Sequence, residues 1–164
     1  MATASTKRNR KNAPEPRKAT APAPPGPFDD FPERRWTYAC AAVLLLAFAE
    51  VVRRQTGPRS LILHAPTYND PVYLTGRRTF LGYPGHVWSH GIDYAPREAD
   101  LKRIYSGAPD VDALIQSAGI EYVVVGPLER EEMRQRGLNV DESFFARYRR
   151  VGEAGAYRLY KTKP

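Results

Sequence analysis

The residues from Leu74 to Tyr94, LTGRRTFLGYPGHVWSHGIDY, combine glycines with side chains that bind ligands or transfer protons. Four glycines in one short segment permit backbone angles that other residues avoid. We therefore interpret this block as a shaped loop, too irregular for a helix, whose polar side chains converge on a ligand. A structural loop whose histidines cap and fill is the alternative. The candidate ligand-binding residues of the block are Arg77, His86, His90 and Asp93.

A metal site is one chemistry that these residues suggest. His86 and His90 stand four residues apart, with Asp93 and His64 as further donors of oxygen and nitrogen. Pro84 and the glycines nevertheless break the helical spacing that makes such a histidine pair informative. We therefore assign no metal ligands, and a metal site in this histidine-rich loop stays an alternative.

Anion binding and acid-base catalysis are two further chemistries. Planar guanidinium groups form bidentate hydrogen bonds with phosphate or a sugar phosphate, and the candidates here are Arg77, Arg78 and Arg130. Asp93 and Glu129 are a candidate carboxylate pair for general acid-base catalysis on a glycoside. The spacing does not fix their separation, so we assign no catalytic residue.

Aromatic residues in the same block suggest a surface for carbohydrate. Tyr83, Trp88 and Tyr94, together with Arg77, provide rings for the apolar face of a sugar and hydrogen bonds for its hydroxyl groups. The alternative is that these rings close the core beneath the loop.

Several motifs are absent from the sequence: GxGxxG, a Walker loop, a GxSxG elbow and a CxxC pair. Nucleotide cofactors, acyl-enzyme chemistry and thiol redox chemistry therefore lack support, and we expect no cofactor. Cys40 is the single cysteine, which excludes a disulfide within the chain and a cysteine-based zinc site.

Three predicted strands position the polar residues. Residues 60–64, 78–81 and 121–125 are short and rich in β-formers, and the VVV of the last one predicts a buried central strand. Because parallel strands end at the same edge of a sheet, we expect the side chains that follow them to share that edge. These are His64, Asn69 and Asp70 after the first strand, residues 82–94 after the second, and Glu129 and Arg130 after the third.

The other elements complete an α/β fold. Residues 70–75 predict a helical turn, and residues 97–105, 111–118 and 130–135 predict helices. Residues 144–151 and 156–160, separated by glycines, predict a hairpin. We expect a small Rossmann-like open sheet with a C-terminal β-hairpin.

Charge separates a tail from the folded part. Residues 1–35 hold eight lysines and arginines against four acidic residues, and residues 55–164 hold fifteen against thirteen, within a net charge of +7. The basic tail is rich in proline and alanine, so we predict that residues 1–35 are disordered. The near-balanced remainder argues against nucleic acid as a partner.

An apolar run, WTYACAAVLLLAFAEVV, begins at Trp36 and is flanked by arginines. We predict a transmembrane helix over residues 36–54, followed by an α/β domain over residues 55–164. The basic residues before the run favour a single-pass protein of the bacterial inner membrane, with the C-terminal domain outside the cytoplasm. A cleaved signal peptide ending near Ala47 to Ala49 and a buried or interfacial helix are the alternatives.

Residues 36–161 also resemble a known family. The segments NDPVYLTGR, GYPGHVWSHG and YVVVGPLER are similar to the C-terminal extramembrane domain of bacterial polytopic glycosyltransferase-like membrane proteins of the mannosyltransferase type. Such proteins carry many membrane helices before this domain, whereas this chain offers at most one. The family's catalytic carboxylate lies in the helix bundle, so the resemblance assigns no catalytic residue.

The resemblance implies a binding or assembly module for a lipid-linked sugar pathway. Its expected partners are the membrane, a polytopic membrane protein and a sugar or sugar-phosphate ligand. The alternative is a small standalone enzyme with a metal or acid-base site in the histidine-rich loop.

Overall fold

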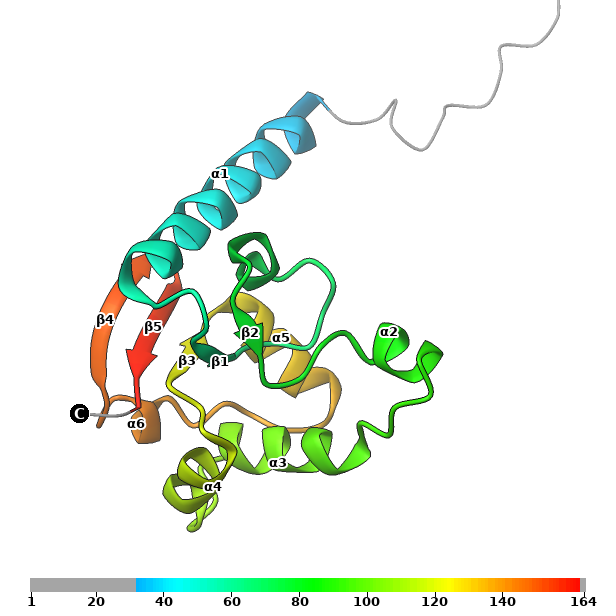
Figure 1. Ribbon diagram of the computed structural model, residues 1–164. Coiled ribbons are helices and arrows are strands. Elements are labelled where there is room, and N and C mark those ends of the chain that lie inside the picture. Colours follow the sequence, from blue (N-terminus) through cyan, green and yellow to red (C-terminus); the bar gives the residue numbers. More distant parts are fainter. Residues whose placement is uncertain (1–31, 163–164) are drawn as a thin grey trace, which may run out of the picture.

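A computed structural model describes residues 32–162, with side chains from residue 39 onward (Figure 1). Of the predicted disordered tail over residues 1–35, residues 1–31 lie outside this description, as do the side chains of Trp36 and Tyr38, whereas residues 32–35 form the first turn of a helix. The elements in chain order are α1 (Pro32–Gln55), β1 (Leu61–Leu63), the 3-10 helix η1 (Pro71–Thr75), β2 (Arg78–Thr79), α2 (Pro84–Ser89), α3 (Ala95–Tyr105), α4 (Val111–Ala118), β3 (Tyr122–Val125), α5 (Pro127–Gln135), α6 (Glu142–Phe145), β4 (Arg149–Ala154) and β5 (Tyr157–Lys161).

The strands form one open, mixed five-stranded sheet in the order β2-β1-β3-β5-β4. β1 pairs in parallel with both β2 and β3, and β5 runs antiparallel to β3 and β4. The predicted α/β class is therefore confirmed, and so is the parallel arrangement of the three strands that precede the candidate residues. The chain closes with the β4–β5 hairpin at one end of the sheet.

Helices cover both faces of the sheet, which gives three layers (Figure 1). Successive β3 residues face opposite layers because side chains alternate along a strand. Val123 and Val125 pack with the layer of α3, α4, α5 and α6, whereas Tyr122 and Val124 pack with α1 and η1. The three valines have no exposed surface, so the predicted buried central strand is confirmed.

Two local predictions are wrong. Residues 84–89 form α2 and are not an irregular loop, because Pro84 occupies the first helical turn, where its missing N–H costs nothing. Residues 142–145 form α6, so the strand predicted from residue 144 begins only at Arg149. There the Asp141 side chain accepts a hydrogen bond from the Phe144 amide and caps a short helix.

The C-terminal turns of α1 belong to the core. Phe48, Ala49 and Val52 are completely buried, and the Phe48 ring stacks on Tyr157 of β5 at a centroid distance of 4.9 Å. The amino-terminal half extends beyond the body of the molecule (Figure 1). Across residues 32–162, no helix is both long and apolar enough to cross a membrane.

Gly126, between β3 and α5, permits a close contact with Tyr157. A Cβ atom at this position would lie 2.2 Å from the Tyr157 ring. Gly126→Ala is therefore expected to lower the free energy of unfolding by about 1–3 kcal/mol through overpacking. Thermal or urea melting measures this change, with Gly57→Ala as control because its nearest contact would be an ordinary 3.5 Å. Equal stability of both variants would contradict the close approach of the Tyr157 ring to Gly126.

Candidate functional site

Three predicted polar residues meet where the parallel strands end. His64 follows β1, Asp70 precedes η1, and Glu129 lies in the first turn of α5, directly after β3. Their exposed fractions are 1%, 2% and 0%. The chain passes from β1 outward to β2 and then back across to β3, so the β1/β3 boundary is a topological switch point, where open α/β sheets place their ligands. The predicted convergence is confirmed for these three residues.

Short polar contacts hold this buried cluster in place. His64 Nδ1 lies 2.7 Å from the Ala65 carbonyl oxygen and 3.3 Å from Asp70 Oδ1. Asp70 Oδ1 also accepts a 2.8 Å hydrogen bond from the Val72 amide, which caps η1. The Ala65 amide donates to Glu129 Oε1 at 3.0 Å, so Glu129 ties α5 to the segment after β1.

One buried carboxyl group of the cluster, that of Glu129, has a strongly raised pKa. Burial, the charge of Asp70 and a hydrogen bond with the Asp70 side chain raise the pKa of Glu129 to about 8. Without a proton between them, Glu129 Oε2 and Asp70 Oδ2 have no hydrogen-bond partner. A protonated Glu129 that donates to Asp70 satisfies both oxygens, so Glu129 is mostly neutral at pH 7.

His64 has a free acceptor or donor position inside the protein. Its Nε2 atom is buried and has no hydrogen-bond partner. The ring meets Tyr73 edge to face, with centroids 5.0 Å apart. The side chains of the cluster are closed off from solvent.

Arg77 is used inside the chain. Its guanidinium donates to the carbonyl oxygens of Arg53 and Thr56 at 2.8 and 3.0 Å, and to that of Thr75 at 2.9 Å. It therefore ties the end of α1 to the turn before β2. These contacts occupy the guanidinium group that the sequence suggested for a phosphate.

Arg130 also lies in an internal pair. It donates to Glu142 Oε1 at 2.7 Å, and Glu142 Oε2 accepts from Arg158 at 3.0 Å. This pairing raises the pKa of Arg130 and lowers that of Glu142. The structure brings Arg130 toward α6 and β5, and Glu129, its neighbour in sequence, toward the buried cluster.

The histidine-rich loop lies at the surface. His86 and His90 are exposed, and Asp93 accepts a 2.9 Å hydrogen bond from the Ala95 amide at the start of α3. In the part of the chain that the structure describes, no group of three histidines, cysteines or carboxylates lies close enough to hold a metal ion. Asp93 is exposed and Glu129 is buried, so these two do not form an acid-base pair.

Two cavities adjoin the buried cluster. An apolar groove of about 450 Å³ contains Asn69 and runs along α1, and its lining is Ala41, Leu44, Leu45, Asn69, Pro127, Leu128 and Tyr157. An aromatic pocket of about 350 Å³ is lined by Tyr68, Tyr73, Gly82, Tyr83, His86 and Val87. Trp88 is 74% exposed and Tyr94 packs against the core, so the predicted rings do not form one platform.

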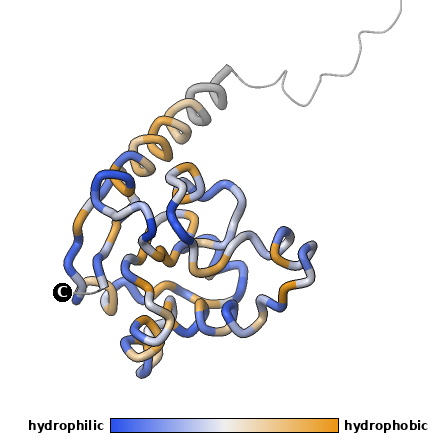
Figure 2. Tube along the Cα trace, viewed as in Figure 1, coloured by the Kyte–Doolittle hydropathy of each residue, from blue (hydrophilic) through white to orange (hydrophobic). Residues whose placement is uncertain are grey.

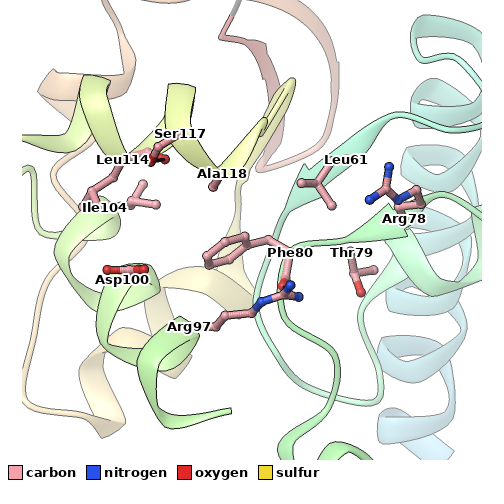
Figure 3. A pocket seen from close by; sticks show the side chains of 10 residues that line it. All are labelled: Leu61, Arg78, Thr79, Phe80, Arg97, Asp100, Ile104, Leu114, Ser117 and Ala118. Carbon is pink, nitrogen blue, oxygen red and sulfur yellow. Dashed lines mark hydrogen bonds between the residues drawn. The ribbon is translucent and has the colours of Figure 1, made fainter. Parts of the chain in front are cut away.

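A further hollow of about 320 Å³ lies at the β2 edge, away from the buried cluster. Figure 3 shows Phe80, Leu61, Ile104 and Ala118 around a common space. Arg97 lies over the Phe80 ring and donates to the Phe80 carbonyl oxygen at 3.0 Å. Of the two arginines that line the hollow, Arg78 and Arg97, the second therefore contacts the protein itself at Phe80.

The sequence interpretation missed two features of this edge. It paired Glu129 with Asp93, whereas the buried partner is Asp70, the residue before Pro71 at a helical turn. It also overlooked Tyr68 and Tyr73, although both flank Asn69 and Asp70 in sequence. The available signal was that each follows β1 within ten residues, at the edge where ligands collect.

The chain matches no model of a protein family, and no curated protein matches it.

Proposed function

We propose that this chain is a membrane-associated assembly module of the bacterial inner membrane. The amino-terminal half of α1 contacts the membrane and a polytopic membrane protein, and the α/β body lies outside the cytoplasm. The observation that carries this proposal is a helix whose one end is fixed in the core and whose other end exposes apolar side chains. Val43, Leu44 and Leu46 are 65%, 45% and 60% exposed.

The apolar surface of α1 continues beyond the body of the protein. Figure 2 shows hydrophobic residues along the part of the helix that extends from the sheet. Phe48, stacked on Tyr157, fixes the direction of that extension. Neighbouring apolar residues exposed on one element indicate an interaction with protein or membrane.

The length of α1 outside the body favours packing against a helix of the partner protein over a crossing of the membrane by α1 alone. From Leu44 onward the helix contacts the body, because Leu44 lies beside Gly155 and Leu45 packs against the core, which leaves residues 36–43 of the apolar run. This stretch measures about 12 Å at ~1.5 Å per residue, less than the ~30 Å of a hydrocarbon core. The body would therefore rest against the membrane surface while α1 packs beside helices of the polytopic partner.

The apolar groove beside α1 provides a second surface for that partner. Leu44 and Leu45 of the helix and Leu128 of α5 line it, and Asn69 adds a polar rim. A transmembrane helix from the partner would bury this groove together with the exposed face of α1.

The resemblance gives this module its place in a lipid-linked sugar pathway. Under the proposal, the sugar or sugar phosphate binds to the helix bundle of the partner, where the related proteins carry their catalytic carboxylate. The engagement of Arg77 and Arg130 in internal contacts supports this division. Under this proposal the Rossmann-like α/β body, with its parallel β2-β1-β3 strands, serves as a scaffold that positions α1 against the partner.

Cys40 allows a direct test, because it is the single cysteine and lies exposed on the free half of α1. An environment-sensitive fluorophore on Cys40 is expected to shift to shorter wavelengths when phosphatidylethanolamine–phosphatidylglycerol vesicles are added. Leu46→Asp should weaken vesicle binding about a hundredfold, since an aspartate in the hydrocarbon core costs about 3 kcal/mol. Ile92→Asp is the matched control, because Ile92 is 59% exposed and lies between α2 and α3, outside α1.

An unshifted spectrum with vesicles, or equal effects of the two aspartates, would contradict the membrane contact. The partner is tested in cells by cross-linking from Cys40, which should capture a multi-helix membrane protein. Protease added to spheroplasts should digest the α/β body, and a body protected from the protease would show that the orientation is reversed.

A further inference from the structure

The aromatic pocket is built by three segments that meet at the carboxyl edge of the parallel strands. Tyr68 follows β1, Tyr73 lies in η1, and Tyr83 and His86 belong to the segment after β2. We call these four residues the aromatic cage. Its cavity of about 350 Å³ falls within the ~300–1,000 Å³ typical of small-molecule sites.

The rings of the aromatic cage stand nearly perpendicular to one another. Tyr68 and Tyr83 meet at 76° with centroids 5.9 Å apart, and Tyr83 and His86 meet at 86° and 5.3 Å. Gly85 makes this arrangement possible, because a Cβ there would lie 2.6 Å from the Tyr83 ring. Perpendicular rings form walls around a compact ligand, whereas a sugar stacks on a flat ring.

The charges around the cage disfavour an anion. Its lining contains no lysine or arginine, and it also lacks the carboxylate and amide side chains that hydrogen-bond sugar hydroxyls. Burial, and after it the charge of the nearby Asp70, raises the pKa of Tyr73 to about 12. The Tyr73 hydroxyl therefore stays neutral, and a negative group lies near it.

We propose that the aromatic cage binds an organic ammonium group, such as a quaternary or methylated amine. The negative faces of aromatic rings attract a cation within about 6 Å of the ring centre, and aromatic cages are a common way to recognise quaternary ammonium. Methyl groups on the nitrogen would contact Tyr68 and Tyr83, and Asp70 would add long-range attraction. This proposal does not depend on the membrane contact of α1.

Titration of the purified full-length chain with choline, in a nonionic detergent, tests the cage. The matched ligand is 3,3-dimethyl-1-butanol, which has the shape of choline without its charge. Choline is expected to bind at least about tenfold more tightly than this alcohol, because only the cation gains from the ring faces. Calorimetry gives both affinities, and NMR signals of the His86 ring should shift with choline alone.

Variants locate the site. Tyr83→Leu should weaken choline binding at least about fivefold, and Trp88→Leu should leave it unchanged, because Trp88 lies on the same helix as His86 but outside the pocket. Melting curves check that each variant is folded. Tyr68→Leu replaces Tyr83→Leu if the latter unfolds, since Tyr68 is 67% exposed.

A comparison of choline with lipid vesicles decides whether the ammonium group belongs to a free amine or to a lipid headgroup. If a free amine is the ligand, choline saturates the site and phosphatidylcholine vesicles bind no better than phosphatidylglycerol vesicles. If a lipid headgroup is the ligand, phosphatidylcholine vesicles bind more tightly, and Tyr83→Leu removes the difference. Equal affinity for choline and its neutral analogue, or no binding of choline, overturns the proposal whatever α1 does in membranes.

Discussion

Val124→Asp is expected to prevent the protein from folding. Val124 lies in the central strand, pairs with Leu159 of β5, and has no exposed surface. Its side chain packs in the layer of Phe48, so an aspartate there would have an unpaired charge in an apolar core. The cost of several kcal/mol is a large part of the ~5–15 kcal/mol by which a typical domain is stable.

Soluble expression and a thermal melt of the purified chain measure this effect. Leu74→Asp also replaces an apolar side chain by aspartate, but at a residue that is 53% exposed, and this variant should melt within a few degrees of the parent. A cooperative melt of Val124→Asp near the parent temperature would mean that β3 is not the centre of the sheet.

The second large effect concerns pH. Glu129 has a pKa of about 8 in the folded protein against 4.5 as its ordinary value, because burial and Asp70 disfavour its charged form. Between these two values the folded protein holds a proton that the unfolded chain has released. The contribution of Glu129 is therefore fully present below pH 4.5, and it is lost as the pH rises toward 8. The expected slope is on the order of 1 kcal/mol per pH unit.

Glu129→Gln should remove this slope. A glutamine amide keeps the acceptor for the Ala65 amide and donates to Asp70 as the protonated carboxyl does. Urea unfolding from about pH 5 to about pH 8 measures the difference between the parent and the variant. Glu131→Gln, a change at an exposed salt bridge with Arg134, is the control and should retain the slope of the parent. The same slope in Glu129→Gln would assign the pH dependence to another group.

The sequence by itself determined the elements whose signals are local. The VVV run predicted β3 because a strand buried on both faces is apolar at every position, and valine favours strands. The sequence predicted a helical turn over residues 70–75, where η1 forms, and a helix over residues 111–118, which is α4 and ends before Gly119, whose φ is +68°. From the β-type runs before His64 and Glu129, the sequence also predicted that these residues share an edge with Asp70.

Other features depend on contacts between residues far apart in the chain. Arg77 looked like an anion-binding fork, but the end of α1 and the turn before β2 place three carbonyl oxygens around it. The sequence could not show that Phe48 is buried in the protein, because a helix in the membrane and a helix in a protein core have the same apolar side chains. The pairing of Glu129 with Asp70 arose from the crossing of the chain at the β1/β3 boundary. Only the tertiary structure decided these features, since burial and charge proximity depend on which segments pack together.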